Sequence, residues 1–134
     1  MISSIGNDMS NLTLRLTDET MAIHSLPANS AIPEQVLNAP IYFLAKTPNE
    51  VSIVVPSDVE IDSDDVEDDW RMFEVIGPLA FSLTGILSNI SSVLANEKIS
   101  IFAISTFDTD HILIKSPKIS QAKNALLAHG YNII

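Results

Sequence analysis

Hydrophobic and polar residues alternate strictly over residues 12–16, which is the pattern of a half-buried β-strand. Shorter apolar runs follow at residues 21–24, 41–45 and 51–55, and turn-forming residues bound each of them. Pro33 marks the start of a short helix over residues 33–37, because proline fits the first helical position. The first half of the chain therefore predicts a strand-rich module with little helix.

The second half of the chain contains stretches with the hydrophobic periodicity of an α-helix. Apolar residues recur at i, i+3 and i+4 over residues 83–94, which predicts an amphipathic helix with Ser82 as its N-cap. Ser116 and Pro117 predict the start of another helix, and Gly130 its left-handed end. Apolar runs predict strands at residues 72–76, 99–105, 111–115 and 131–134. This order of elements predicts an α+β fold of the ferredoxin-like βαββαβ type.

An acidic stretch separates the two halves. Residues 60–69 are mostly Asp and Glu, and like charges keep such a segment solvated. They predict a linker between an N-terminal module of residues 11–59 and a C-terminal module of residues 70–134. The polar residues 1–10 predict a loose leader.

A weak internal repeat relates the two modules. When residues 45–55 are laid over residues 104–114, strand, threonine, turn and strand coincide, with Thr47 on Thr106. An internal repeat is the simplest account of this match. The first copy then lacks the last helix and strand, so we expect a tandem with a truncated N-terminal module.

Composition limits the possible partners. The net charge of −10 disfavours nucleic acid and anionic membrane surfaces, which attract clustered Lys and Arg. There is no signal peptide pattern at the start, and no apolar run approaches the roughly 20 residues of a membrane helix. We therefore expect a soluble, cytoplasmic protein. We expect no cofactor and no metal, because there is no nucleotide-binding glycine motif and the three histidines lack metal-ligand spacing.

Residues 77–87 form an uncharged corner between a strand and a helix, and they are the first candidate site. Backbone N–H groups at such a Gly-Pro corner, together with the helix dipole, attract a carboxylate or another anion. Gly85 removes a side chain where a ligand would approach closely. An alternative is that Gly85 only lets the helix pack on the sheet, and the residues leave this open.

Residues 105–110 are the second candidate site. Their hydroxyls and carboxylates suit an ammonium or guanidinium group at a strand end. The alternative is a polar hairpin in which Asp108 and Asp110 are solvated or form Asx turns. The two stretches together suit an amino acid, whose carboxylate would meet N–H donors and whose cationic end would meet acids. Ser82, His111 and Asp110 have the residue types of a triad, but the G-x-S-x-G elbow is absent, so we do not expect an enzyme.

The corner at residues 77–87 and the run at residues 104–111 resemble the small bacterial tandem ACT-domain proteins. These are similar to the ACT modules of the CASTOR-type arginine sensors and of aspartokinase regulatory regions. The resemblance extends from about Asn11 to the end of the chain. It implies βαββαβ modules, homodimers or pseudo-dimers, and regulatory binding of an amino acid at an interface between modules.

The resemblance also implies where the ligand contacts fall. Carried over by position, they are the corner and the facing strand end, namely Phe81, Ser82, Leu83, Thr84, Gly85, Ser105, Thr106, Phe107 and Asp108. We hypothesise that residues 82–85 hold the carboxylate of the ligand and that Asp108 holds its amino end. One alternative is a protein–protein interaction module in which Phe81 and Phe107 fill the pocket, and a less favoured one is a small enzyme.

Overall fold

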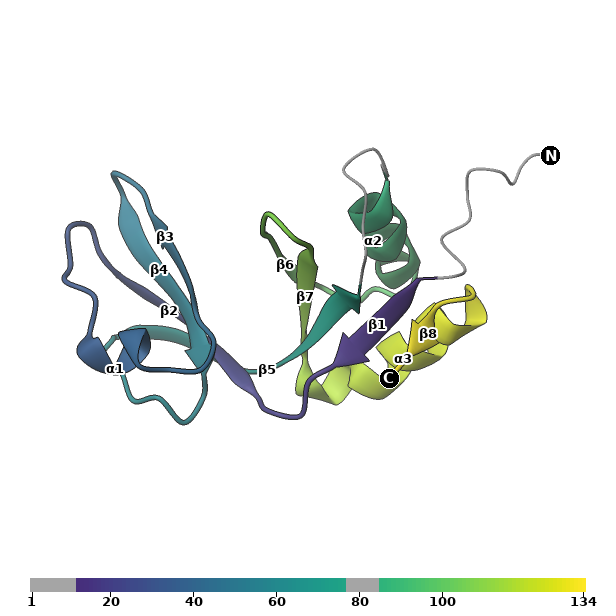
Figure 1. The fold of residues 1–134 in the computed structure, drawn as a ribbon, viewed down its shortest axis with the longest axis horizontal. Helices are drawn as coiled ribbons and strands as arrows, with labels where there is room; N and C mark the ends of the chain where they lie inside the picture. The colour runs from purple at the N-terminus through teal and green to yellow at the C-terminus, as the bar shows by residue number, and fades with distance from the viewer. Residues whose placement is uncertain (1–11, 77–84) are drawn as a thin grey trace. The chain divides into compact units, whose positions relative to one another are not determined.

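The computed structural model describes residues 12–76 and 85–134 of the chain. The predicted leader and residues 77–84, with the predicted N-cap Ser82, lie outside the described residues. The elements in chain order are β1 (Thr13–Leu16), β2 (Met21–Pro27), α1 (Glu34–Leu37), β3 (Phe43–Lys46), β4 (Glu50–Pro56), β5 (Asp65–Ile76), α2 (Ile86–Asn96), β6 (Phe102–Ser105), β7 (Asp110–Lys115), the 3-10 turn η2 (Ser116–Lys118), α3 (Ile119–Ala128) and β8 (Asn132–Ile133) (Figure 1).

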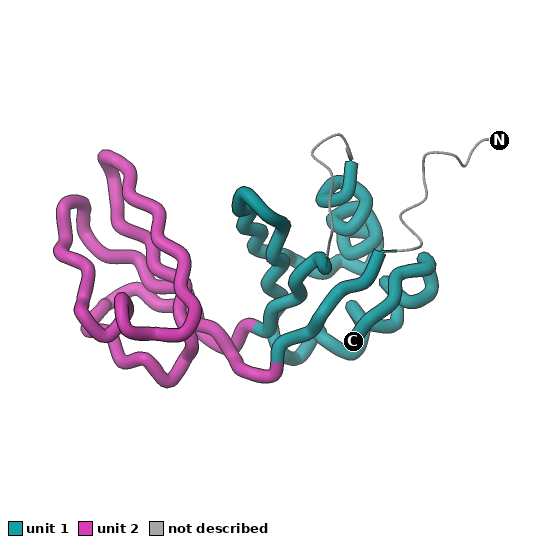
Figure 2. The backbone as a smooth tube through the Cα atoms, in the orientation of Figure 1, with its two compact units in different colours: residues 1–17, 71–134 teal, residues 18–70 magenta. Residues whose placement is uncertain are grey.

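The chain divides into two compact units. Unit 1 consists of residues 1–17 and 71–134, and unit 2 of residues 18–70 (Figure 2). The boundary between Trp70 and Arg71 falls inside β5, so the first half of this strand belongs to unit 2 and the second half to unit 1.

Unit 1 is a mixed sheet with helices packed on it. Its strand order is β6-β7-β5-β1-β8, with β1 antiparallel to β5 and parallel to β8. The buried core joins strand residues to the apolar faces of α2 and α3, and it consists of Leu14, Phe73, Val75, Ile86, Ile90, Val93, Leu94, Ile99, Ile112, Ile114, Ile119, Ala122, Ala125, Leu126 and Tyr131. The predicted α+β class is confirmed for this unit, and Gly130 ends α3 with the predicted left-handed φ of 92°.

Strand β1 lies in a different unit from the one that the sequence suggested. The predicted N-terminal module of residues 11–59 included this strand, whereas β1 pairs with β5 and β8 of unit 1. Leu14 is fully buried opposite Val75, so its hydrophobic face completes the core of unit 1. The strand also separates β5 from β8, which would be neighbours in a simple ferredoxin-like sheet.

Unit 2 is a smaller antiparallel sheet in the order β3-β4-β2-β5. One face of the sheet carries its own core of Val36, Val51, Ile53 and Val55. Val36 comes from α1, which has one turn only, so a single helical turn and the chain segments beside it cover this face.

The acidic linker predicted at residues 60–69 is corrected by the structure, because residues 65–69 are the first part of β5. These residues are exposed and pair with β2 at the edge of the unit 2 sheet. Charged side chains are common on edge strands, since they discourage pairing with other chains. The register shifts at a bulge next to Asp69, whose φ of 68° an aspartate tolerates better than a β-branched residue. Residues 65–69 thus add the strand that follows β2 in the order of the unit 2 sheet.

The two hairpins that the sequence aligned have the same geometry. In β3–β4, Lys46 faces Val51, and in β6–β7, Ser105 faces Asp110, so the register agrees with the alignment. The Thr47 N–H donates to the carbonyl of Glu50 (3.0 Å), as the Thr106 N–H does to the carbonyl of Thr109 (2.8 Å). Each threonine hydroxyl also accepts from the backbone N–H three residues further on.

We predict that Leu14→Ala lowers the free energy of unfolding by about 2–5 kcal/mol, because it leaves a cavity in the unit 1 core. Leu44→Ala is the matched control. Leu44 lies on β3 and is 42% exposed, so the same truncation should cost less than about 1 kcal/mol. Urea unfolding followed by circular dichroism measures both changes. Equal, small losses for the two variants would contradict the placement of β1 in this core.

Candidate functional site

The predicted ligand contacts are only partly described. Phe81, Ser82, Leu83 and Thr84 lie outside the described residues. Gly85, immediately before α2, and the four hairpin residues Ser105, Thr106, Phe107 and Asp108 are described.

Gly85 occupies the N-cap position of α2, which begins at Ile86, later than the predicted N-cap Ser82 would have placed it. Its φ of 81° is left-handed, which favours glycine because a side chain would clash there. Its carbonyl accepts the Asn89 N–H at 2.8 Å, while no side chain caps the helix. The first N–H groups of α2 therefore receive no capping hydrogen bond from Gly85, and the helix dipole favours an anion at this end.

A buried tyrosine fixes the start of α2. The Tyr131 hydroxyl donates a hydrogen bond to the Asn89 side chain, across from the end of α3 to the first turns of α2. Tyr131 is 2% exposed, and burial raises its pKa to about 12, so the hydroxyl stays protonated as a donor. Ile86 and Ile90 anchor the same helix in the core. The position of the helix N-terminus is thus set by packing as well as by the glycine.

All four predicted residues of the hairpin between β6 and β7 are exposed, but two of them form hydrogen bonds within the hairpin. The Ser105 hydroxyl donates to the Asp110 carboxylate at 2.6 Å, and the Thr106 hydroxyl bonds within the turn. These two side chains shape the hairpin. Phe107, at 80% exposed, and the exposed Asp108 form its tip. The Phe107 side chain therefore does not fill a pocket among the described residues, which the interaction-module alternative had expected.

Thr109 ties the hairpin to the strand that leads into the corner. Its hydroxyl donates to the carbonyl of Val75 at 2.5 Å, one residue before β5 ends. The tip of the β6–β7 hairpin, the end of β5 and the start of α2 therefore lie at the same end of unit 1 (Figure 1). Thr109 lies within the second candidate stretch, residues 105–110, but the sequence assigned no role to it. In the alignment of the two hairpins Thr109 falls on Glu50, and this match was the only sequence signal at the position.

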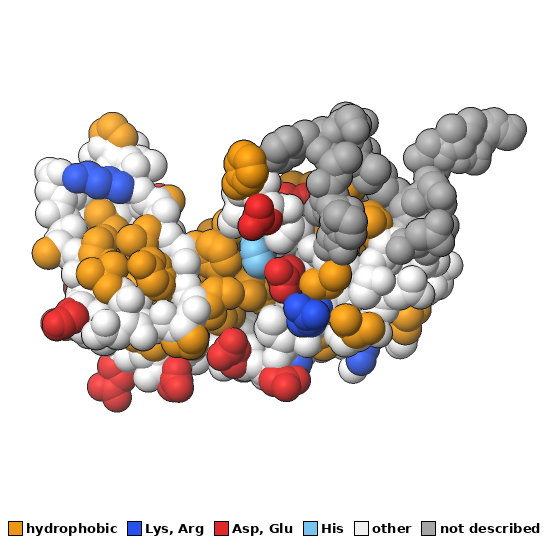
Figure 3. Space-filling view, in the orientation of Figure 1, with side chains coloured by type: hydrophobic (Ala, Val, Ile, Leu, Met, Phe, Trp, Pro, Cys, Tyr) orange, Lys and Arg blue, Asp and Glu red, His pale blue; other side chains and the backbone are white. Residues whose placement is uncertain are grey.

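His111 is the buried titratable group nearest to this hairpin. It is 8% exposed and faces Ile104 across the β6–β7 pair. Burial lowers its pKa, while the nearby charges of Glu74 and Asp110 act in the opposite direction. Glu74 also pairs with Arg15 at 3.6 Å, and Figure 3 shows a histidine with acidic side chains beside it. The triad partner considered for His111, Ser82, lies outside the described residues.

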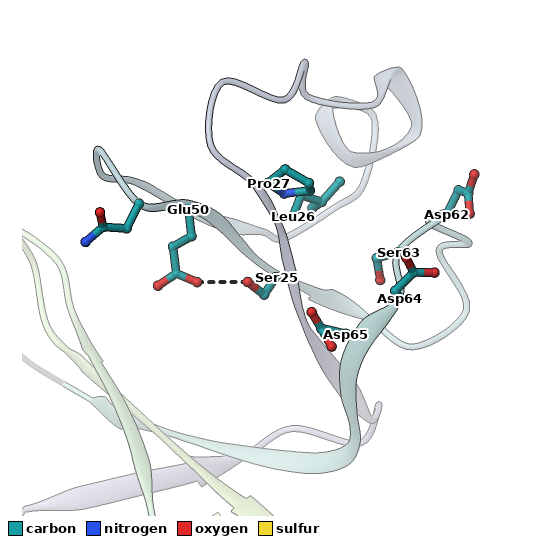
Figure 4. A pocket seen from close by; sticks show the side chains of 9 residues that line it. Ser25, Leu26, Pro27, Glu50, Asp62, Ser63, Asp64 and Asp65 are labelled. Atoms are coloured by element: carbon teal, nitrogen blue, oxygen red, sulfur yellow. Dashed lines mark hydrogen bonds between the residues drawn. The ribbon is translucent and has the colours of Figure 1, made fainter.

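Unit 2 contains a pocket of about 370 Å³ that the sequence did not predict (Figure 4). The end of β2, the start of β4 and the residues entering β5 line it, namely Ser25, Leu26, Pro27, Asn49, Glu50, Asp62, Ser63, Asp64 and Asp65. Asp62, Asp64 and Asp65 form an acidic wall of this pocket, and the sequence had indicated only a solvated linker for them. The pairing of Ser25 with Asp65 brings this wall to the strand end, and no local pattern signals that pairing.

Two hydrogen bonds order the walls of this pocket. The Ser25 hydroxyl donates to the Glu50 carboxylate at 2.9 Å, which joins β2 to β4. On the other side, Nδ1 of His24 lies 2.7 Å from the Ser63 hydroxyl. His24 is 6% exposed, and burial lowers its pKa while the charge of Asp68 raises it. A neutral imidazole at neutral pH therefore holds the segment that carries the acidic wall.

Residues 12–76 and 85–134 contain no group of three or more acidic or histidine side chains placed to hold one metal ion. Their helices also lack the length and apolar character that a bilayer-spanning helix needs.

The fold, with a glycine-capped helix at the same end as a polar hairpin, defines a small α+β domain, and similar proteins are known. Residues 65–128 match the family model described as the ACT domain. The cytosolic arginine sensor for mTORC1 subunit 1 of Rattus norvegicus is 34% identical over 116 residues, covering 78% of this chain and 34% of that protein. The chain thus spans about a third of the length of the curated relatives it matches.

Solved structures are similar over most of the chain. The crystal structure of protein Atu0741 from Agobacterium tumefaciens is 31% identical with a TM-score of 0.86, covering 92% of both chains. The regulatory subunit of aspartate kinase from Thermus thermophilus shares the fold alone, at 12% identity and a TM-score of 0.58 over 84% of this chain and 95% of that one. The resemblance to ACT domains that the sequence indicated is therefore confirmed, and the family match falls on residues 65–128.

We predict that stability falls as pH decreases below about 6.5, because His24 and His111 have lowered pKa values in the folded protein. The unfolded chain then binds more protons than the folded one, so acidification favours unfolding. The loss of melting temperature between about pH 7.5 and pH 5.5 should be smaller in the double variant His24→Gln/His111→Gln. His129→Gln, at an exposed position, is the control and should keep the wild-type slope. An unchanged slope in the double variant would contradict the prediction.

Proposed function

We propose that this chain is a non-catalytic regulatory protein that binds a small molecule, an amino acid, at the corner of unit 1. The observation that carries the proposal is the Thr109–Val75 hydrogen bond, which brings the hairpin tip to the end of β5. An anion-favouring helix N-terminus at Gly85 and an acidic hairpin tip at Asp108 then belong to one end of the unit. A zwitterion needs this combination.

In this proposal each predicted residue has a role. Ser82, Leu83, Thr84 and Gly85 hold the carboxylate beside the N-terminus of α2, where an anion is favoured, and Phe81 is a further contact of the ligand. The Asp108 carboxylate binds the amino end, and Phe107 covers the ligand beside it. Ser105 and Thr106 act indirectly, because their hydroxyls hold the hairpin in shape.

Relatives support a regulatory role. One relative is named an arginine sensor, and a structural neighbour is named a regulatory subunit of aspartate kinase. The first name also supports a cytosolic location for this chain. Both names describe binding or regulation, which agrees with a protein that has no catalytic role of its own.

We also propose that unit 2 is a second, truncated ACT-like module. The matching register and hydrogen bonds of the β3–β4 and β6–β7 hairpins support it. In this proposal the module uses the first half of β5 as its last strand and lacks only the second helix. Two chains would associate as a homodimer, since β3 and β6 pair on one side only within the described residues and leave an edge for a partner strand.

A protein–protein interaction module is the second candidate. The exposed Phe107 favours it, because large aromatic side chains at a loop tip are typical anchors for a partner protein. In that case Phe107→Ala would abolish partner binding, and no small molecule would compete.

We predict that one or more of the twenty amino acids raises the melting temperature of the full chain, because a ligand that binds only the folded state stabilises it. Thermal shift finds the ligand, and calorimetry gives its affinity. Asp108→Asn should weaken that binding about tenfold, since it removes the charge that meets the ammonium group.

Asp58→Asn is the matched control for this experiment. It removes the same charge at an exposed position of unit 2, so it should leave the affinity unchanged. A folded chain whose melting temperature responds to none of the amino acids would overturn the proposed function. Equal weakening by both variants would assign the effect to net charge.

A further inference from the structure

We infer that the pocket of unit 2 is a second, separate binding site, for a small organic dication without a carboxylate, of the diamine or polyamine class. The inference concerns chain segments that the proposed amino-acid site does not use. It rests on the size of the pocket, the distribution of charge in its walls and the absence of an anion-binding element beside it.

The size of the pocket suits an organic molecule. Its volume of about 370 Å³ lies within the range of small-molecule sites, which begins at about 300 Å³. A single metal ion would need several carboxylates converging on one point. The described acidic and histidine side chains form no such group, so the negative charge is spread along the pocket.

The charge is arranged at two sides of one strand. Glu50 lies on β4, and Asp64 and Asp65 lie at the entry to β5, with β2 between them (Figure 4). Adjacent strands are ~4.8 Å apart, and β2 lies between β4 and β5, so the backbones of the two walls are about 10 Å apart. A molecule with a positive group at each end can satisfy both walls together.

The lining between the two walls suits the chain of such a molecule. Leu26 and Pro27 are its apolar members, and methylene groups can pack on them. Ser25 and Ser63 are both held by the hydrogen bonds already described, so the shape of the pocket is set before a ligand enters. A preformed site loses less entropy on binding.

The pocket is not built for a carboxylate. Its lining contains four acidic residues, Glu50, Asp62, Asp64 and Asp65, and no Lys or Arg. The helix of unit 2, α1, has one turn and offers no extended dipole. An amino acid such as arginine would bring its own carboxylate against these acids, whereas its decarboxylated form, agmatine, would not.

The test is calorimetry on the full chain at about 150 mM salt with putrescine, spermidine, agmatine, arginine and magnesium chloride as separate probes. We expect saturable binding of at least one of the amines or agmatine, with shifted backbone amides at Ser25 and Asp65 in nuclear magnetic resonance. Arginine and magnesium should shift these two amides only at concentrations at least tenfold higher. No saturable binding of any amine, or arginine shifting the Ser25 and Asp65 amides at the same concentration as agmatine, would overturn the inference.

Variants separate this site from the general negative charge of the chain. Glu50→Gln with Asp64→Asn should weaken binding at least tenfold, since each removes a charge-assisted hydrogen bond while keeping the shape. Asp58→Asn is the control, because Ser57 beside it bonds to Thr20 at the opposite end of β2. Equal weakening by control and double variant would mean diffuse counterion binding and would overturn the site.

The same variants distinguish this inference from the proposed amino-acid site. Asp108→Asn should leave the binding of the amine unchanged, and the Glu50→Gln/Asp64→Asn variant should leave amino-acid binding unchanged. If either variant lost both amine binding and amino-acid binding, the two sites would not be separate. Absence of amino-acid binding alone would remove the proposed function and leave the amine site standing.

Discussion

The pairing of β5 with strands from the first part of the chain is the interaction on which the rest of the structure depends. Its first half pairs with β2 and closes the sheet of unit 2, and its second half pairs with β1 in the sheet of unit 1. Neither sheet is complete without residues distant in sequence. This requirement explains why the acidic residues 65–69 are ordered as a strand rather than solvated as a linker.

The placement of both candidate sites follows from the same arrangement of strands. In each unit a strand leads towards a helix, and a threonine-closed hairpin lies beside the end of that strand. Side chains at aligned hairpin positions make the connection, Thr109 to Val75 in unit 1 and Glu50 to Ser25 in unit 2. The local chemistry then differs. Unit 1 adds the N-terminus of a long helix, which favours an anion, whereas unit 2 adds an acidic wall, which favours a cation.

Much of the candidate site in unit 1 was predictable because its signals are local. Gly85 marks a left-handed backbone, and the run from Ser105 to Asp108 marks a polar turn between two apolar strands. The roles inside that turn were not predictable, since a serine or threonine can equally bind a ligand or close its own hairpin. Ser105 and Thr106 do the latter, through contacts that depend on the register of β6 and β7.

The sequence by itself determined most of the elements, the α+β class and the resemblance to ACT domains, because hydrophobic periodicity, caps and turns act over a few residues. The structure decided that β1 lies between β5 and β8, that residues 65–69 form an edge strand, and that Ser25 meets Asp65 beside a pocket. Each of these depends on which strand finds which partner. Strand pairing is a long-range choice made by the burial of whole faces, and no single stretch of sequence records it.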